Sequence, residues 1–212
     1  MLTEEYRERN IERVLDEALL LCEEIGIPAV NKTNLARRAK LSPKSIQRYF
    51  DDKTDMIFKV SQKLMKRNDR EIRELLKEKN MKEMDGISQL KWFLQVHNRY
   101  VLEKYKEMVF LQSADIYCRY AGQQPEKYWK AFRDSASVEK AIETFMKRGV
   151  EDGSIRKELI APDFVTTVAV LCAGLVERLA TDIDCQIVSV EEAIELSEGW
   201  INHVTTHLGT RV

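Results

Sequence analysis

Glycine and proline are scarce in this sequence, which has 8 glycines and 4 prolines among 212 residues. β-Sheets need frequent tight turns, and those turns draw on both residue types, so the shortage favours an all-α protein. Hydrophobic residues make up 44% of the chain and charged residues 33%, a globular composition that argues against disorder. The length allows one large domain or two small ones.

The four cysteines show no spacing typical of a disulfide framework or a zinc site. Cys22, Cys118, Cys172 and Cys185 are scattered without a C-x-x-C pair, and we interpret them as buried apolar side chains in a reducing cytosol. No stretch reaches about 18 apolar residues, and the first ten residues, MLTEEYRERN, are charged. We therefore expect no transmembrane helix, no signal peptide and a cytoplasmic location.

Motifs that carry catalysis are also missing from the sequence. It has no glycine-rich phosphate loop, no G-x-S-x-G, no H-E-x-x-H and no E-x-x-H of a di-iron bundle. His203 and His207 stand four residues apart, a spacing that can hold a metal, but no third ligand is near in the sequence. A surface pair is the simpler interpretation. We predict that the chain is not an enzyme and has no metal and no cofactor.

Two helix start signals do occur between residues 31 and 53, NKTNLARRAKLSPKSIQRYFDDK. Asn31 can cap a first short helix, and Ser42 followed by Pro43 can start a second. Lys40 and Leu41 form the turn between them. Residues at helical spacing give each helix an apolar face: Leu35, Ala36 and Ala39 in the first, and Ile46, Tyr49 and Phe50 in the second. This is the helix-turn-helix pattern, whose second helix enters the DNA major groove.

Charge in this window supports DNA binding. Residues 31–53 hold seven basic residues against two acidic ones, a net charge of +5, whereas residues 1–30 have a net charge of −5. The positive charge is therefore concentrated where a phosphate backbone needs it. The alternative is a solvated amphipathic helix pair, because most charge runs only face solvent. The coincidence of start signals, turn, apolar spacing and charge favours DNA binding.

Residues 11–58 resemble the N-terminal DNA-binding domain of the TetR family of transcriptional regulators. The matching positions are Leu35-Ala36, Ala39, Leu41-Ser42, Ile46, Tyr49-Phe50 and Lys53, of which the aromatic pair followed by lysine is the most distinctive. Two positions depart from the family pattern. Lys40 stands where the family usually has glycine, at a turn that often requires a positive φ. Gln47 stands where the family usually has an aromatic residue.

The resemblance implies which side chains meet DNA. Four would face the major groove: Lys44, Ser45, Gln47 and Tyr49. Gln47 would read a base, because glutamine can bond an adenine edge in two places. Four more would hold phosphates and set the register: Lys32, Thr33, Arg48 and Lys53. The expected division of the chain is a DNA-binding domain over residues 1–54 and a helical effector-binding and dimerisation domain over residues 55–212.

Apolar residues at helical spacing predict the other elements, for about nine helices in all. A first helix from Thr3 to Gly26 is followed by an apolar connector at 27–30. Later helices are expected over 55–79, 87–104, 105–120, 128–150, 162–183 and 190–208. The helix at 162–183 is apolar on more than one face, so it is buried on more than one face. It is either internal core or, as the resemblance implies, part of a homodimer interface with 190–208.

Aromatic residues with a few polar groups gather between residues 87 and 180, a composition typical of a small-molecule site. Taken singly, each of them is better explained as plain core, whereas the resemblance implies that the region as a whole forms a pocket for an effector. The candidates are Trp92, His97, Tyr100, Phe110, Asp115, Tyr117, Trp129, Phe132, Phe145 and Glu177.

The helix-turn-helix pattern predicts a DNA-binding protein, and the resemblance implies a transcriptional regulator, a ligand-responsive repressor that binds a palindromic operator as a dimer. Two alternatives stay open. One is an architectural or division factor of the same fold that binds DNA without a small-molecule effector. The other is an all-α interaction scaffold or enzyme with a misleading basic helix pair.

Overall fold

The computed structural model describes residues 4–121, 137–159 and 162–210, and these ranges contain nine α-helices, two short 3₁₀-helices and no β-strand. The predicted all-α class is therefore confirmed. The described residues form two compact units, one of residues 4–67 and 110–121 and the other of 68–109, 137–159 and 162–210. Two helices, α4 (Lys53–Leu76) and α6 (Tyr105–Ala121), contribute residues to both units. The predicted functional boundary after residue 54 stays a prediction.

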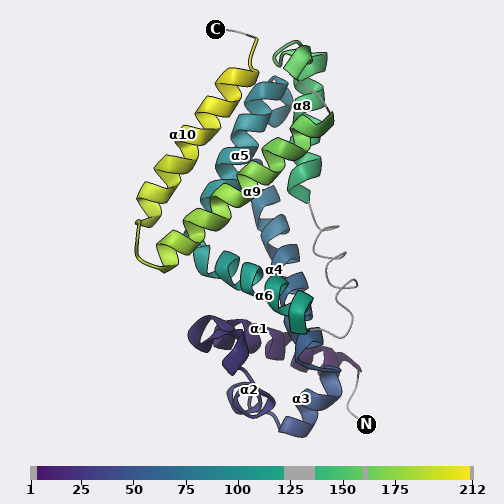
Figure 1. Cartoon of the computed structure of the whole chain (residues 1–212). Helices are drawn as coiled ribbons and strands as arrows, with labels where there is room; N and C mark the ends of the chain where they lie inside the picture. The colour runs from purple at the N-terminus through teal and green to yellow at the C-terminus, as the bar shows by residue number, and fades with distance from the viewer. Residues whose placement is uncertain (1–3, 122–136, 160–161, 211–212) are drawn as a thin grey trace. The chain divides into compact units, whose positions relative to one another are not determined.

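The first unit begins with α1 (Glu4–Ala29), followed by α2 (Lys32–Arg38) and α3 (Pro43–Tyr49) (Figure 1). Gly26 was expected to end the first helix. Its φ of 76° kinks the helix there, and one further turn runs through Pro28 to Ala29. The connector predicted at 27–30 is thus largely a helical turn, whose Ile27 is buried in the core. Only the kink, which favours glycine because of its positive φ, follows from the sequence.

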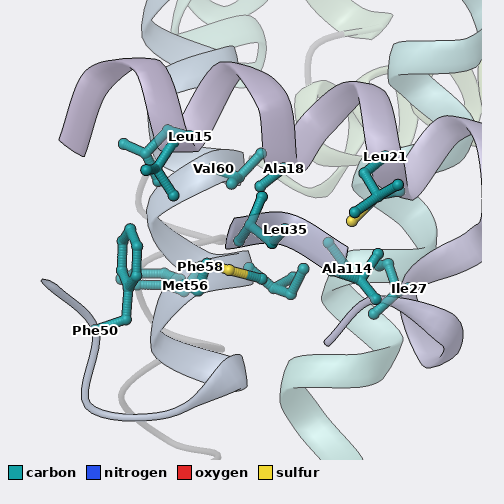
Figure 2. Packing of buried hydrophobic residues seen from close by; sticks show 14 of the residues in the cluster. Leu15, Ala18, Leu21, Ile27, Leu35, Phe50, Met56, Phe58, Val60 and Ala114 are labelled. Carbon is teal, nitrogen blue, oxygen red and sulfur yellow. The ribbon is translucent and has the colours of Figure 1, made fainter. Parts of the chain in front are cut away.

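A helix from later in the chain completes the core of this first unit. Phe110, Ala114 and Cys118 of α6 are 4%, 0% and 0% exposed and belong to one cluster with buried residues of α1, α2, α3 and α4. Figure 2 shows Ala114 among residues from the N-terminal helices, including Leu21 and Ile27. The end of α6 is therefore a structural part of the N-terminal unit.

The second unit is organised around α5 (Gly86–Glu103), which packs against α8 (Ser137–Glu151), α9 (Pro162–Asp184) and α10 (Val190–Leu208) (Figure 1). The 3₁₀-helices η1 (Met81–Glu83) and η2 (Lys157–Leu159) lie in its connections. Of the helix predicted over 128–150, the part before residue 137 lies outside the described residues. The other predicted helices occur within a few residues of their expected bounds.

The start of α5 lies unusually close to the end of α8. A Cβ added at Gly86 would lie 2.1 Å from the backbone nitrogen of Gly149. The Gly86 N–H donates to the Asp152 carboxylate at 2.7 Å, and the Ile87 N–H donates to the Ser154 hydroxyl at 3.1 Å. The turn after α8 thus supplies acceptors for the otherwise unpaired N–H groups that begin α5.

Part of α9, Phe164–Asp184, is long and apolar enough to cross a membrane by length and composition alone. The core helix of a soluble protein passes the same test, so this single helix is weak support for a membrane span. Only 33% of its most apolar stretch is buried within the chain. A large share of this apolar helix is therefore exposed on the described chain.

Candidate nucleic-acid interface

Helix α3 is held by its apolar side and exposes its polar side. Ile46 and Phe50 are 3% and 5% exposed and belong to the core of the first unit. Lys44, Gln47 and Arg48, from the same turn and a half of helix, are exposed. This pattern follows from helical periodicity, because residues three to four positions apart lie on the same face of a helix. The helix is thus presented with its hydrogen-bonding side chains to solvent.

Both predicted caps are present. The Asn31 side chain accepts from the backbone N–H groups of Thr33 and Asn34, and Asn34 in turn accepts from the Asn31 N–H, which makes a reciprocal capping box. The Ser42 hydroxyl accepts from the Ser45 N–H at 3.1 Å, with Pro43 at the first helical position. Local sequence signals therefore set where α2 and α3 begin.

The turn between the two helices places Lys40 in the left-handed region, with φ of 53°. A side chain with a Cβ adopts this conformation at a cost of roughly 1–2 kcal/mol, which glycine avoids. The expectation that this position needs a positive φ is confirmed. The helix-turn-helix geometry therefore persists although lysine stands where glycine is preferred.

A group of cations lies on α2, α3 and the turn between them. Lys32, Arg37, Lys40, Lys44 and Arg48 are all exposed, and none has an ion pair with a carboxylate in the described part of the chain. Their charge is available to an external anion. Arg37 and Lys40 belong to the basic window over residues 31–53 and have no assigned contact, and their exposure adds them to the candidate surface.

Arg38 differs from these cations. Its guanidinium contacts the carboxylates of Glu17 at 2.8 Å and Glu24 at 2.5 Å, both on α1. The hydrogen bond from Arg38 lowers the pKa of the Glu24 carboxyl. Arg38 therefore links α2 to α1. The sequence gives little indication of this pairing, because the partners of Arg38 lie 21 and 14 residues away.

The predicted DNA-contacting residues fall into two groups. Lys32, Thr33, Lys44, Gln47 and Arg48 are exposed, whereas Ser45, Tyr49 and Lys53 are half-buried. The Ser45 hydroxyl lies 3.0 Å from the Ser42 hydroxyl, and the Tyr49 ring meets Phe50 edge to face. Lys53 donates to the Pro28 carbonyl oxygen at 3.0 Å. The half-buried group is thus partly engaged within the protein.

Comparison with known proteins identifies the fold. No protein-family model matches the sequence, and no curated protein matches it significantly. Solved structures do match over almost the whole chain. FadR from Bacillus subtilis in complex with stearoyl-CoA, a transcriptional regulator, has a TM-score of 0.67 at 15% identity, with 95% of this chain and 98% of that one covered.

Two further structures agree. PfmR from Thermus thermophilus, a TetR family transcriptional regulator, has a TM-score of 0.61 at 22% identity, covering 94% of this chain and 100% of that one. A tetR family regulatory protein from Rhodococcus RHA1 has a TM-score of 0.69 at 10% identity, covering 94% and 97%.

The chain has the TetR fold. The resemblance found in residues 11–58 is thereby confirmed at the level of the fold and extends over almost the whole chain. The named neighbours are transcriptional regulators rather than enzymes.

The TetR fold distributes the predicted effector-binding residues over both units. Phe110, Asp115 and Tyr117 lie in the first unit, and Trp92, His97, Tyr100, Phe145 and Glu177 lie in the second. Trp129 and Phe132 lie outside the described residues. The ligand-binding assignment stays a prediction, and the residues that the structure brings together form smaller groups in the second unit.

His97 and Phe145 approach the same ring. The Phe93 ring centroid lies 5.9 Å from that of His97 and 5.6 Å from that of Phe145. His97 contacts the Asn98 side-chain oxygen at 2.9 Å, and the Asn98 amide donates to the Ser197 hydroxyl of α10 at 2.9 Å. Burial lowers the pKa of His97, so its imidazole is neutral at pH 7. This group is a polar network inside the apolar core.

Tyr100 and Trp92 face the end of α4 within the second unit. The Tyr100 hydroxyl donates to Glu71 at 2.8 Å, and Lys104 contacts the same carboxylate at 2.6 Å. Tyr100 also lines an open groove of about 670 Å³ together with Arg70, Glu71, Glu74, Leu75 and Glu78. The Trp92 indole N–H donates to the Leu76 carbonyl at 3.4 Å, with the Lys79 ammonium 3.8 Å from the ring centroid.

Proposed function

We propose that this chain is a DNA-binding transcriptional regulator that binds a palindromic operator as a homodimer and releases it when a small-molecule effector binds, so that it acts as a repressor. The observation that carries the proposal is the exposed polar side of α3, flanked by cations without ion pairs in the described residues, on a chain with the TetR fold. Residues 1–54 would read DNA, and residues 55–212 would bind the effector and dimerise.

The proposed reading of DNA separates base contacts from phosphate contacts. Lys44, Ser45, Gln47 and Tyr49 would enter the major groove, where the Gln47 amide bonds an adenine edge and discriminates by roughly 1–3 kcal/mol. Lys32, Thr33 and Arg48 would hold phosphates and fix the register. The exposure of Lys32, Gln47 and Arg48 supports these roles. The resemblance assigned Lys53 a phosphate contact as well, but its ammonium already donates to the Pro28 carbonyl oxygen.

The proposed dimer would use α9 and α10. Val170, Leu171 and Leu196 on these helices are 64%, 53% and 56% exposed, an unusual level for large apolar side chains. A Cβ added at Gly174 or Gly199 would meet nothing within 4 Å, so both helices also offer small residues for close approach. The two copies of α3 in a symmetric dimer would face DNA half-sites one turn apart, about 34–36 Å or slightly more.

The proposed effector site lies in the helical domain over residues 55–212. One structural neighbour with this fold was solved with stearoyl-CoA, which supports a small-molecule ligand for this chain without naming it. An effector releases DNA only through its difference in affinity for the DNA-binding and non-binding conformers. The proposal includes no catalysis, no metal and no cofactor, and it places the protein with DNA in the cytoplasm.

A selection of bound genomic fragments tests the function. Purified protein is incubated with fragmented DNA from its own genome, and the recovered duplexes are bound again across a salt series. We expect enrichment of palindromic duplexes and an affinity that falls steeply with salt, because each phosphate contact displaces a condensed counterion. A selection that recovers no sequence in preference to random DNA contradicts the proposal.

A further inference from the structure

Lys53, the first residue of α4, is engaged by two parts of its own unit. Its ammonium donates to the Pro28 carbonyl oxygen at 3.0 Å and lies 5.4 Å from the centroid of the Tyr117 ring on α6. It is half-buried, whereas Lys32 and Arg48, assigned the same phosphate role, are exposed. If the Lys53 side chain reoriented to contact a DNA phosphate, its ammonium would lose both the hydrogen bond to the Pro28 carbonyl and the contact with the Tyr117 ring.

The carbonyl that Lys53 binds belongs to the corner that starts the helix-turn-helix pair. At this corner two successive carbonyls are bonded by side chains: Asn34 of α2 donates to the Ala29 carbonyl at 3.0 Å, and Lys53 donates to that of Pro28. Asn31, two residues after Ala29, caps α2. The direction in which α2 leaves the corner is therefore tied to the first residue of α4.

The ring that Lys53 contacts belongs to a helix that cannot move independently of this core. Ala114 and Cys118 of α6, on either side of Tyr117 in the sequence, are fully buried in the core of the first unit. The Cys118 thiol lies 4.0 Å from the Thr54 carbonyl, beside Lys53 in the chain. The core of the first unit therefore holds the Tyr117 ring beside the Lys53 ammonium.

We propose that Lys53 is a positioning residue for operator binding, which ties the corner before α2 to the Tyr117 ring of α6 and so holds the DNA-reading helices in place. This inference rests on the proposed function and deepens it by naming a residue that orients these helices from inside the first unit. Loss of either Lys53 or the Tyr117 ring loosens the corner at Pro28.

The test measures operator affinity across a salt series for Lys53→Met, Tyr117→Leu, the double variant and wild type, with the duplex recovered in the selection above. We expect Lys53→Met to weaken binding about 10-fold, the loss of one charged hydrogen bond, with the salt slope of wild type. Tyr117→Leu also weakens binding, and the double variant binds no more weakly than Lys53→Met because both changes break one linkage.

Two matched controls separate positioning from phosphate contact. Lys32→Met, which removes an exposed cation, is expected to lower the salt slope by about 0.9. Tyr117→Phe keeps the ring and is expected to bind as wild type does. Far-UV circular dichroism and urea unfolding of each variant confirm that it is folded at the binding temperature.

The contrary outcomes are distinct. If Lys53→Met lowers the salt slope as Lys32→Met does, while Tyr117→Leu binds normally, Lys53 is a phosphate contact and the inference is overturned. Additive losses in the double variant overturn it as well, since they show no linkage. If the wild-type protein prefers no duplex, the proposed function itself is contradicted. The two preceding outcomes contradict only the role of Lys53 and leave the proposed function standing.

Discussion

At the scale of single residues, the helix-turn-helix pair combines strong local signals with one unfavourable position. Asn31 and Ser42 cap their helices as the sequence indicates, and these bonds are local, so they are readable without the fold. Lys40 adopts a positive φ that glycine accommodates better. The chain thus retains a cation beside the recognition helix together with some backbone strain.

Lys40→Gly should stabilise the protein relative to Lys40→Ala by about 1 kcal/mol, because alanine keeps the Cβ that is strained at this φ. Both variants lose the same charge, so any change in DNA affinity from charge is shared. Urea unfolding of the two variants gives the comparison. Equal unfolding free energies would show that the turn relaxes without strain.

The buried His97 gives the protein a predictable pH dependence. Burial lowers its pKa below the ordinary 6.5, so below pH 6.5 the unfolded chain takes up a proton that the folded chain does not. Stability that is complete above pH 6.5 is therefore lost as the pH falls towards the folded pKa. We therefore expect the free energy of unfolding to fall between pH 7.5 and pH 5.5.

The measurement is urea unfolding at both pH values for wild type and His97→Asn, which keeps a short amide donor. The variant should lose most of this pH dependence. The carboxyl groups with lowered pKa, such as Asp152, lose their contribution only at more acidic pH and do not confuse the comparison. A variant with the full wild-type slope would assign the effect to other groups.

At the scale of elements, the sequence located most helices but not how they share cores. Helix periodicity and capping are local, so α2, α3, α5, α6, α9 and α10 lie close to their predicted ranges. The burial of Phe110, Ala114 and Cys118 in the N-terminal core depends on tertiary packing, and the local sequence carries no signal for it. The same reason explains why predicted pocket residues such as Phe110 and Phe145 fall in different units.

Gly86→Ala should destabilise the protein by about 2–3 kcal/mol, because the new methyl group meets the backbone of Gly149 and Arg148. Gly149→Ala is the matched control. Its methyl would meet side-chain atoms of Ile155, the nearest at 2.5 Å, which can shift at lower cost. Thermal unfolding of both variants tests the contact. A larger loss for Gly149→Ala than for Gly86→Ala would contradict the predicted order.

At the scale of the whole molecule, α9 and α10 leave an apolar surface that a second copy would cover. Leu171→Glu should convert a dimer to a monomer, because it places a charge in the proposed interface. Leu20→Glu is the control, since Leu20 is 45% exposed on α1 in the other unit. Light scattering after size exclusion reports the mass. A wild-type monomer, or a dimeric Leu171→Glu variant, would contradict the proposed assembly.

The central claim is that α3 reads DNA bases, and the most direct measurement compares Gln47→Ala with wild type on an operator carrying each single base-pair change. We expect the variant to lose preference at one position in each half-site, by about 10-fold or more, with an unchanged salt slope. Lys32→Ala should instead weaken all duplexes alike and reduce the slope by about 0.9. If Gln47→Ala keeps the full preference at every position, α3 does not read DNA in the way proposed.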